Sequence, residues 1–174
     1  MPQIEIRPFT AADRDWVQQQ HALNYAQTDG FDASFGVLVG QILDDFLTKA
    51  DTTDEAGWIA QQGNAQLGSI FCVRQGSETA KLRLFLLVPA ARGKGIGQLL
   101  LKTCMEFAQD RGYSEMRLWT HESHKAACNL YLKCGWQLEN AKPVRSFGQN
   151  LVEQAWIYRF HPSCNSDPWA VNPR

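Results

Sequence analysis

The stretch LFLLVPAARGKGIG, residues 84–97, decides how this chain folds. Its apolar first half is typical of a buried strand, and its glycine-rich second half leads into an amphipathic segment with helical spacing. Gly93, Gly95 and Gly97 leave room for backbone N–H groups to close around an anion, and a helix that begins there adds the positive end of its dipole. The sequence therefore predicts a strand, a turn and a helix that together hold a phosphate group.

Two common phosphate-binding motifs do not match this stretch. A Rossmann dinucleotide motif needs the spacing G-x-G-x-x-G, whereas the glycines here fall as G-x-G-x-G. A P-loop needs a serine or threonine after its lysine, and Lys94 is followed by Gly95. The pattern R-x-x-G-x-G at residues 92–97, after an apolar strand that ends at Pro89, instead resembles the pyrophosphate loop of the GNAT superfamily of N-acetyltransferases, which bind acyl-CoA.

A second motif of the same superfamily follows about thirty residues later, in SHKAACNLYLKCGW, residues 123–136. We expect a short helix there, ended by Gly135 in a left-handed conformation. His124 stands where the superfamily usually has asparagine. Two motifs in the expected order are more specific than either alone, so the chain is identified as a member of the GNAT superfamily. The matching positions are Ala127, Leu130, Tyr131, Gly135 and Trp136.

A closer resemblance covers residues 1–160. Residues 29–32, 80–84, 118–120 and 146–148 are similar to the acetyltransferase domain of bacterial proteins that fuse it to a winged-helix regulator. The resemblance implies one GNAT domain over residues 1–160, followed by an irregular tail at residues 161–174. It also implies an α+β fold, an α/β/α sandwich with a mixed, mostly antiparallel sheet of six or seven strands and about four helices.

The elements can be placed from hydrophobic spacing and turn residues. Helices are predicted after Thr10, after the turn at residues 29–30, over residues 95–109, and in the segment that ends at Gly135. Strands are predicted at residues 4–8, 58–61, 67–73, 80–88, 116–120 and 151–160, with one more that begins at Trp136.

Two of these strands carry further expectations. Alternation in the strand at residues 80–88 predicts that Leu82, Leu84, Leu86 and Val88 share one face. Lys81, Arg83, Phe85 and Leu87 would then share the other face. The strand at residues 151–160 is expected to close the sheet and to offer an edge for a homodimer.

Composition excludes several classes of protein. The formal net charge is −1 and no basic run is present, which argues against nucleic-acid binding. No segment approaches the roughly 20 apolar residues of a membrane span, and the N-terminal residues lack the features of a signal peptide. We therefore expect a cytoplasmic protein whose five cysteines are reduced.

A zinc site can be built on paper from two histidines and two cysteines, but it lacks the spacing of known zinc motifs. No metal is therefore expected. The four residues are His121, His124, Cys128 and Cys134.

The resemblance also implies how acetyl-CoA would be bound and used. The backbone of Phe85, Leu86 and Leu87 would hold the pantetheine arm and polarise the thioester carbonyl. Tyr131 matches the general acid that protonates the departing sulfur; alternatively, it only packs and hydrogen-bonds locally. The remaining expected cofactor contacts are Arg92, Gly93, Lys94, Gly95, Ile96 and Gly97 at the pyrophosphate, with His124 and Asn129 nearby.

The general base and the acceptor are left open. Many relatives carry a glutamate on the strand after the long helix, but residues 118–120 contain none. Glu122 and His124 lie just beyond that strand and are candidates for the base, and a base that acts through water is a further alternative. Otherwise Glu122 is an acceptor contact or a charge favoured by the helix dipole, and His124 replaces the usual asparagine as a CoA or backbone contact. Asp32 would bind a cationic acceptor or cap a helix, and Phe31 would line an apolar pocket.

The expected activity is acetyl transfer from acetyl-CoA to a primary amine of a small, amino-acid-like molecule. A protein N-terminus or lysine is the second choice of acceptor. A module that binds acyl-CoA without turnover is the alternative from another functional class.

Overall fold

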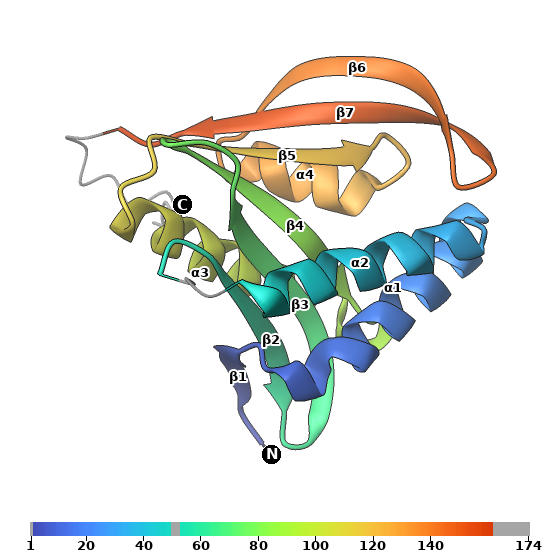
Figure 1. Cartoon of the computed structure of the whole chain (residues 1–174), viewed down its shortest axis with the longest axis horizontal. Coiled ribbons are helices and arrows are strands. Elements are labelled where there is room, and N and C mark those ends of the chain that lie inside the picture. Colours follow the sequence, from blue (N-terminus) through green and yellow to red (C-terminus); the bar gives the residue numbers. More distant parts are fainter. Residues whose placement is uncertain (1, 50–52, 162–174) are drawn as a thin grey trace, which may run out of the picture.

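The computed structural model describes residues 2–49 and 53–161, which form one mixed sheet in the order β1-β2-β3-β4-β5-β7-β6 (Figure 1). Only β4 and β5 pair in parallel; the other neighbours are antiparallel. The strands are β1 (Ile4–Pro8), β2 (Ala56–Gln62), β3 (Ala65–Arg74), β4 (Thr79–Leu87), β5 (Glu115–His121), β6 (Gln137–Ser146) and β7 (Gln149–Arg159). The helices are α1 (Arg14–Asp29), α2 (Ala33–Thr48), α3 (Ile96–Asp110) and α4 (Lys125–Lys133), with short 3-10 turns at Ala11–Asp13 and Pro89–Ala91.

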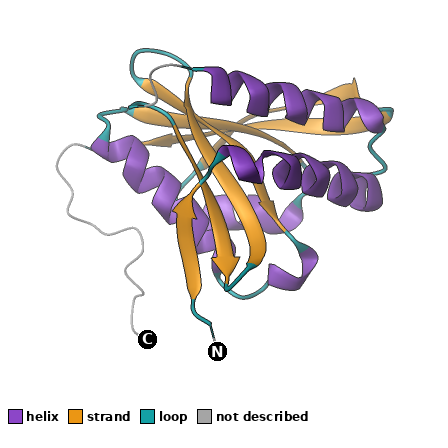
Figure 2. Ribbon diagram, turned by 60° about the horizontal axis from the view of Figure 1, so that its bottom comes forward, coloured by secondary structure: helices purple, strands orange, loops and turns teal. Residues whose placement is uncertain are grey.

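The helices cover both faces of the sheet (Figure 2). A small apolar cluster that includes Val39 and Phe71 joins α1 and α2 to one face. A larger cluster that includes Leu100 of α3 and Tyr131 of α4 covers the other. Burial of apolar side chains on both faces is what holds the three layers together. The α/β/α sandwich predicted from the sequence is therefore confirmed.

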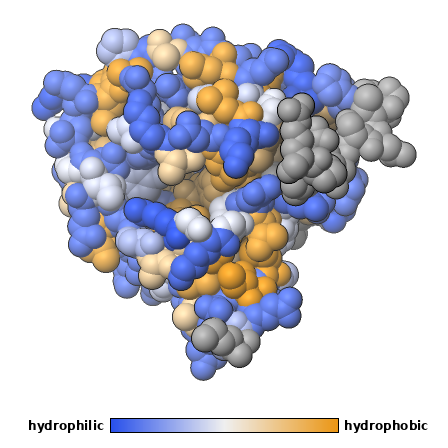
Figure 3. Space-filling model, turned by 180° about the vertical axis from the view of Figure 1, so that it is seen from behind, coloured by the Kyte–Doolittle hydropathy of each residue, from blue (hydrophilic) through white to orange (hydrophobic). Residues whose placement is uncertain are grey.

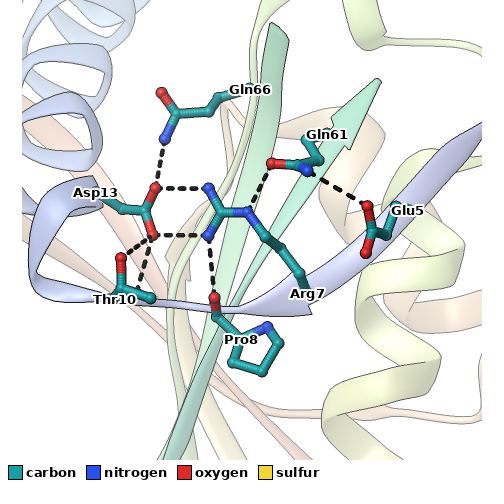
Figure 4. Close-up of polar contacts among 7 residues, drawn as sticks. All are labelled: Glu5, Arg7, Pro8, Thr10, Asp13, Gln61 and Gln66. Atoms are coloured by element: carbon teal, nitrogen blue, oxygen red, sulfur yellow. Dashed lines mark hydrogen bonds and ion pairs between the residues drawn. The ribbon is translucent and has the colours of Figure 1, made fainter. Parts of the chain in front are cut away.

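A buried ion pair fixes where the first helix begins (Figure 4). The helix expected after Thr10 opens with a 3-10 turn, and α1 follows from Arg14. Asp13 is only 3% exposed, and its two carboxylate oxygens accept hydrogen bonds from Arg7 of β1 at 2.7 and 2.8 Å. Gln66 of β3 donates to the same carboxylate at 2.6 Å. The carboxylate of Asp13 thus ties β1, β3 and the start of α1 together.

The strict alternation predicted for β4 is wrong beyond Arg83. Leu84 packs with the cluster under α1 and α2, whereas Phe85 and Leu87 pack with the cluster under α3 and α4. The cause is a β-bulge: between the pairs Phe71–Arg83 and Ser69–Leu86, β4 has two residues where β3 has one. Leu84 adopts φ 49° there, and Leu84, Phe85 and Leu87 lie on the faces opposite to those predicted, whereas Val88 packs with the same cluster as Leu82.

The sheet edge proposed for the homodimer is also wrong. β7 pairs with β5 on one side and with β6 on the other, so its backbone is engaged on both sides. The strand expected from Trp136 begins at Gln137 as β6, and a tight turn at Phe147 and Gly148 returns the chain into the sheet as β7. The outer strand on this side is β6. The homodimer itself stays a prediction, and the tail predicted at residues 161–174 lies, beyond His161, outside the described residues.

Candidate functional site

Near the middle of the sheet, the hydrogen-bonded pairing of two neighbouring parallel strands stops, which leaves a gap between them. β4 and β5 pair only over Thr79–Lys81 and Glu115–Arg117, and then diverge (Figure 1). Within the described residues, the edge of β4 that faces β5 therefore has no strand partner from Leu82 onward. From behind, the face that carries α3 and α4 is hollowed near its middle, and hydrophobic residues show within the hollow (Figure 3). Backbone N–H and C=O groups in such a gap are available to a ligand.

The bulge in β4 lies within this divergent part. The hydroxyl of Ser69, which is fully buried, donates to the carbonyl of Leu84 at 2.8 Å. Gly68 is required beside it, because a Cβ there would come within 2.6 Å of the Leu86 carbonyl. These contacts hold the strained Leu84 in place and fix the direction of the following backbone of Phe85, Leu86 and Leu87.

The glycine-rich loop after β4 has the conformation that its sequence predicts. Gly93 and Gly95 have φ of 73° and 77°, in the left-handed region that glycine adopts without strain. A Cβ at either residue would meet nothing within 4 Å, so the loop faces open space. The first backbone hydrogen bond of α3 runs from Leu99 to Gly95, and the N–H groups before Leu99 point out of the helix end. The loop and helix end can therefore bind an anion.

The cationic residues of the loop are exposed. Arg92 and Lys94 both face solvent, and Arg92 donates to the carbonyl of Leu87 at 3.4 Å. Gly97 packs closely instead, because a Cβ there would lie 3.2 Å from Leu87. Ile96 is buried beneath the loop. The six expected pyrophosphate residues thus divide into an open cradle with two cations and two residues that anchor α3 to β4.

Tyr131 of α4 packs against the divergent part of β4 and against β7. Its ring centroid is 6.3 Å from that of Phe85 on β4 and 6.0 Å from that of Trp156 on β7. The residue is 3% exposed, and its hydroxyl makes no hydrogen bond within the part of the chain that the structure describes. Burial raises the pKa of Tyr131 well above its usual value, and the nearby phenol of Tyr25 adds to this effect. Tyr131 is therefore a protonated donor without an acceptor among the described residues.

Tyr25 of α1 is a second phenol at the site. Burial raises its pKa to about 12; the charge of Asp29 acts in the same direction and that of Arg92 in the opposite direction. Tyr25 therefore lies within electrostatic reach of the loop cation. Its ring also meets the ring of His124 edge-on, with centroids 5.0 Å apart.

His124 connects α4 to the end of α1. Its Nε2 lies 3.0 Å from Asp29 Oδ2, and its Nδ1 lies 3.3 Å from the hydroxyl of Thr120. Burial opposes ionisation of Asp29, but hydrogen bonds from Thr28, His124 and Ser123 outweigh it and lower the pKa. Because both ring nitrogens have partners, His124 fixes the start of α4 against the end of α1 and against β5.

His121, at the end of β5, is the candidate that sequence reasoning considered only as a zinc ligand. Its ring meets Phe31 at 5.6 Å and His124 at 5.5 Å. Burial lowers the pKa of His121, and the neighbouring His124 contributes in the same direction. Within the described residues the imidazole makes no hydrogen bond, so His121 has a neutral ring whose nitrogens have no partner there. The sequence offered one signal for this residue: His121 directly follows residues 118–120, where the glutamate expected from the resemblance is missing.

An aromatic group closes the end of the site. Phe31 and Phe35 contact Phe147 at centroid distances of 4.9 and 5.0 Å. Phe147 sits in the β6–β7 turn with φ 54°, unusual for a bulky residue, and its carbonyl accepts from the N–H of Asp32 at 3.0 Å. The turn of β6–β7 is thereby fastened over the α1–α2 turn (Figure 1).

Three predicted contact residues lie at the rim. The carboxylate of Asp32 caps α2 by accepting from the Ser34 N–H at 3.0 Å, as its alternative interpretation expected. Glu122 is exposed and 3.7 Å from Lys125. Asn129 is exposed on α4. Among the described residues, no hydrogen bond or ion pair connects any of these three side chains to the free edge of β4.

No cluster of three or more metal-ligating side chains forms among residues 2–49 and 53–161. Cys128 instead lies 3.4 Å from the amide oxygen of Gln154. The four cysteines in these ranges are free and buried, and Cys164 lies outside them. In the same ranges no helix is both long and apolar enough to cross a membrane.

Known proteins share this fold. The structure matches the Salmonella typhimurium protein yncA, determined with acetyl-CoA as its cofactor, with a TM-score of 0.77 at 17% identity, over 97% of this chain and 99% of that one. It also matches a spermidine N-acetyltransferase from Vibrio cholerae, determined with CoA and spermine, with a TM-score of 0.70 at 13% identity, over 90% and 95%. At these identities the likeness establishes the fold.

The sequence adds the family. Rat N-acetyltransferase 8F1 is 34% identical over 104 residues, which are 57% of this chain and 43% of the relative. Rat N-acetyltransferase 8 is 31% identical over 123 residues, 67% and 55% of the two chains. The chain thus spans about half the length of the curated relatives it matches. The model of the acetyltransferase (GNAT) family matches residues 18–136, which contain the glycine loop, the diverging strands and Tyr131. This chain belongs to the acetyltransferase (GNAT) family.

Proposed function

We propose that this protein transfers the acetyl group of acetyl-CoA to the primary amine of a small molecule, by direct attack of the amine on the thioester. One observation carries the proposal. An open glycine loop that can bind an anion follows β4 directly, and the phenol of Tyr131, which has no hydrogen-bond partner among the described residues, packs beside Phe85 on that strand. A long thioester with a pyrophosphate needs both features at once.

The chain's own residues fit acetyl-CoA in three places. Residues 92–97 would hold the pyrophosphate on backbone N–H groups, with Arg92 and Lys94 adding positive charge. The free edge of β4 at Phe85–Leu87 would bind the pantetheine amides and direct an N–H at the thioester oxygen, where negative charge develops during attack. His124 would position α4 through Asp29, and exposed Asn129 would contact the cofactor from the same helix.

Proton transfers are assigned to two side chains. The acceptor loses its ammonium proton to water before it attacks. His121 then takes the proton that the neutral amine nitrogen loses as it bonds to the carbonyl carbon, because a lowered pKa keeps the imidazole neutral at pH 7. Tyr131 gives its phenolic proton to the sulfur as the carbon–sulfur bond breaks, leaving free thiol. The raised pKa of Tyr131 keeps that proton in place beforehand. Water returns the proton from His121 to Tyr131 between turnovers.

The aromatic closure favours a small acceptor. Phe31, Phe35 and Phe147 contact one another across the α1–α2 turn and the β6–β7 turn, which limits the opening at this end. Asp32 and Glu122 at the rim would meet the cationic amine as it enters. The V. cholerae neighbour is named for a small polyamine, whereas a Brucella melitensis neighbour with a TM-score of 0.75 is named ribosomal-protein-alanine N-acetyltransferase. A cytoplasmic location, the homodimer and the likeness to regulator-fused domains stay predictions from the sequence.

Free thiol release tests the proposal. The purified chain is incubated with acetyl-CoA and a panel of small primary amines, thiol is measured with a disulfide dye, and the acetylated product is identified by mass spectrometry. Release that depends on both the amine and the protein is the expected result. Release with peptides alone would move the acceptor to protein N-termini or lysines. Tight CoA binding in calorimetry with no release for any amine or peptide would show a module that only binds acyl-CoA.

A further inference from the structure

A second hollow lies on the α1 and α2 side of the sheet. It has a volume of about 600 Å³ and opens between the C-terminal half of α2, the end of β3 and the start of β4. Lys81 and Arg83 lie on this side because Ala80 and Leu82, which alternate with them, pack with the cluster under α3. Its lining includes Asp45, Lys49, Arg74, Lys81 and Arg83.

Two of the four cations in the lining have carboxylate partners. Lys49 lies 2.8 Å from Glu55, and Arg74 lies 3.3 Å from Asp54. Lys81 and Arg83 have neither an ion pair nor a hydrogen bond within the described residues. The ammonium of Lys81 instead lies 4.6 Å from the ring centroid of Trp119 on β5.

Lys81 and Arg83 are also partly buried. Burial lowers the pKa of both, and in Lys81 the charge of Arg83 contributes in the same direction. The carboxylates that face them are Asp45 of α2, towards Arg83, and Glu153 of β7, towards Lys81; neither lies within 4 Å, and Glu153 is 3.8 Å from Lys142. Two partly dehydrated cations side by side without a counter-ion are unfavourable until an anion binds.

The position of Arg83 connects this hollow to the transfer site. Arg83 and Leu86 lie opposite Phe71 and Ser69 of β3, so the bulge leaves them about two residues, or about 7 Å, apart along the sheet. Leu86 belongs to the free edge where the thioester carbonyl is proposed to lie. A guanidinium binds carboxylate or phosphate oxygens through two parallel hydrogen bonds, which gives direction as well as affinity.

We infer that Arg83 and Lys81 bind an anionic group of the acceptor, a carboxylate or a phosphate, at the opposite end of the acceptor from the amine that is acetylated. The inference rests on the proposed function and narrows its substrate class. Trp119, 39% exposed beside Lys81, would support the chain that joins the two groups. An acceptor of this class is an extended ω-amino acid, a short peptide with a free C-terminus, or an aminoalkyl phosphate or phosphonate.

A matched set of acceptors tests the inference. 8-Aminooctanoate, the corresponding ω-aminoalkylphosphonate and 8-aminooctanamide differ at one end only, and kcat/KM is measured for each by thiol release. We expect the better of the two anions to exceed the amide by about 10-fold or more. Arg83→Gln should remove that preference and leave the amide rate within about twofold, and Arg83→Lys should keep part of it. The ratio of the carboxylate to the phosphonate identifies the anion.

A charge-matched control and a binding assay separate this inference from the proposed function. Arg111→Gln removes a cation at the far end of α3, where it stacks on Phe107, and should leave the preference unchanged. Calorimetry of 8-aminooctanoate and the phosphonate with free CoA present needs no turnover. Anion binding that is lost in Arg83→Gln supports the inference even if no acceptor is acetylated. Equal binding and equal turnover of all three compounds would overturn it, while thiol release with the amide would still support acetyl transfer.

Discussion

At the scale of single residues, the hydroxyl of Tyr131 is the group whose removal is most informative. Tyr131→Phe keeps the ring contacts with Phe85 and Trp156 and deletes only the donor. General acid catalysis contributes about 10²–10⁴-fold, so kcat should fall on that scale while CoA affinity changes little. Stopped-flow thiol release and calorimetry measure the two quantities.

Tyr113→Phe is the matched control, because Tyr113 is another buried phenol whose hydroxyl donates to the carbonyl of Asp54 at 2.7 Å, away from the gap. It should cost about 1 kcal/mol of stability and leave kcat nearly unchanged. Loss of CoA affinity in Tyr131→Phe, with kcat preserved, would assign the Tyr131 hydroxyl to binding.

His121 predicts the acidic side of the pH profile. A base must be neutral, and burial lowers the pKa of His121 below its ordinary value near 6.5. With both substrates saturating, kcat should therefore be level above about pH 6.5 and fall as pH decreases through that lowered pKa. His121→Gln should reduce kcat by about 10²-fold or more and abolish this limb. An unchanged limb in the variant would assign the titration to another group.

At the scale of elements, the role of the start of α3 in CoA binding can be tested with matched substitutions at the two ends of this helix. Gly95 and Gly112 both have positive φ and open space around them, and they flank the same helix. Alanine at either position costs about 1–2 kcal/mol of backbone strain. Only Gly95→Ala alters the cradle, so it should weaken CoA binding about 10-fold or more, while Gly112→Ala should leave it within about twofold. Equal CoA affinity in the two variants would show that this loop does not bind the pyrophosphate.

The elements themselves were largely predictable, and the exceptions have physical causes. The glycine loop and the helix ended by Gly135 follow from local rules, since glycine alone adopts φ of 73–86° without strain. The bulge at Leu84 was not predictable, because a leucine carries no sign of positive φ and its support comes from Ser69 on another strand. The insertion of β7 between β5 and β6 depends on pairing between distant strands, which alternation does not reveal.

At the scale of the whole molecule, the site is assembled from contacts that are remote in sequence. His124 and Asp29 are 95 residues apart, and Asp32 meets Phe147 through a backbone hydrogen bond. Motifs could propose roles for the loop and Tyr131 because both positions belong to a family pattern. The role of His121 and the unpaired state of Arg83 depend on burial and on which neighbours are absent, and these arise only when α1, α2 and the sheet are packed together.

The ion pair of Arg7 and Asp13 predicts how the whole fold responds to acid. The hydrogen bonds from Arg7 hold the pKa of Asp13 below its ordinary value despite burial, which acts in the other direction. A carboxylate whose folded pKa is depressed adds stability above its unfolded pKa, about 3.9, and loses it as pH falls through the folded pKa. Asp13→Asn removes that contribution and should cost about 1–3 kcal/mol at pH 7, measured by urea unfolding.

The difference in stability between the parent and Asp13→Asn should therefore be constant from pH 7 to about pH 5 and shrink below about pH 4. Asp44→Asn provides the comparison, because Asp44 pairs with Arg14 at 2.8 Å on the exposed surface, where screening by water leaves little net stabilisation. A difference for Asp13→Asn that stayed constant down to pH 3 would show that packing of the side chain, rather than its charge, ties β1 and β3 to the start of α1. The same measurements with CoA present would show whether the loss extends to the cleft, since β3 carries both Gln66, which binds Asp13, and Ser69, which supports the bulge.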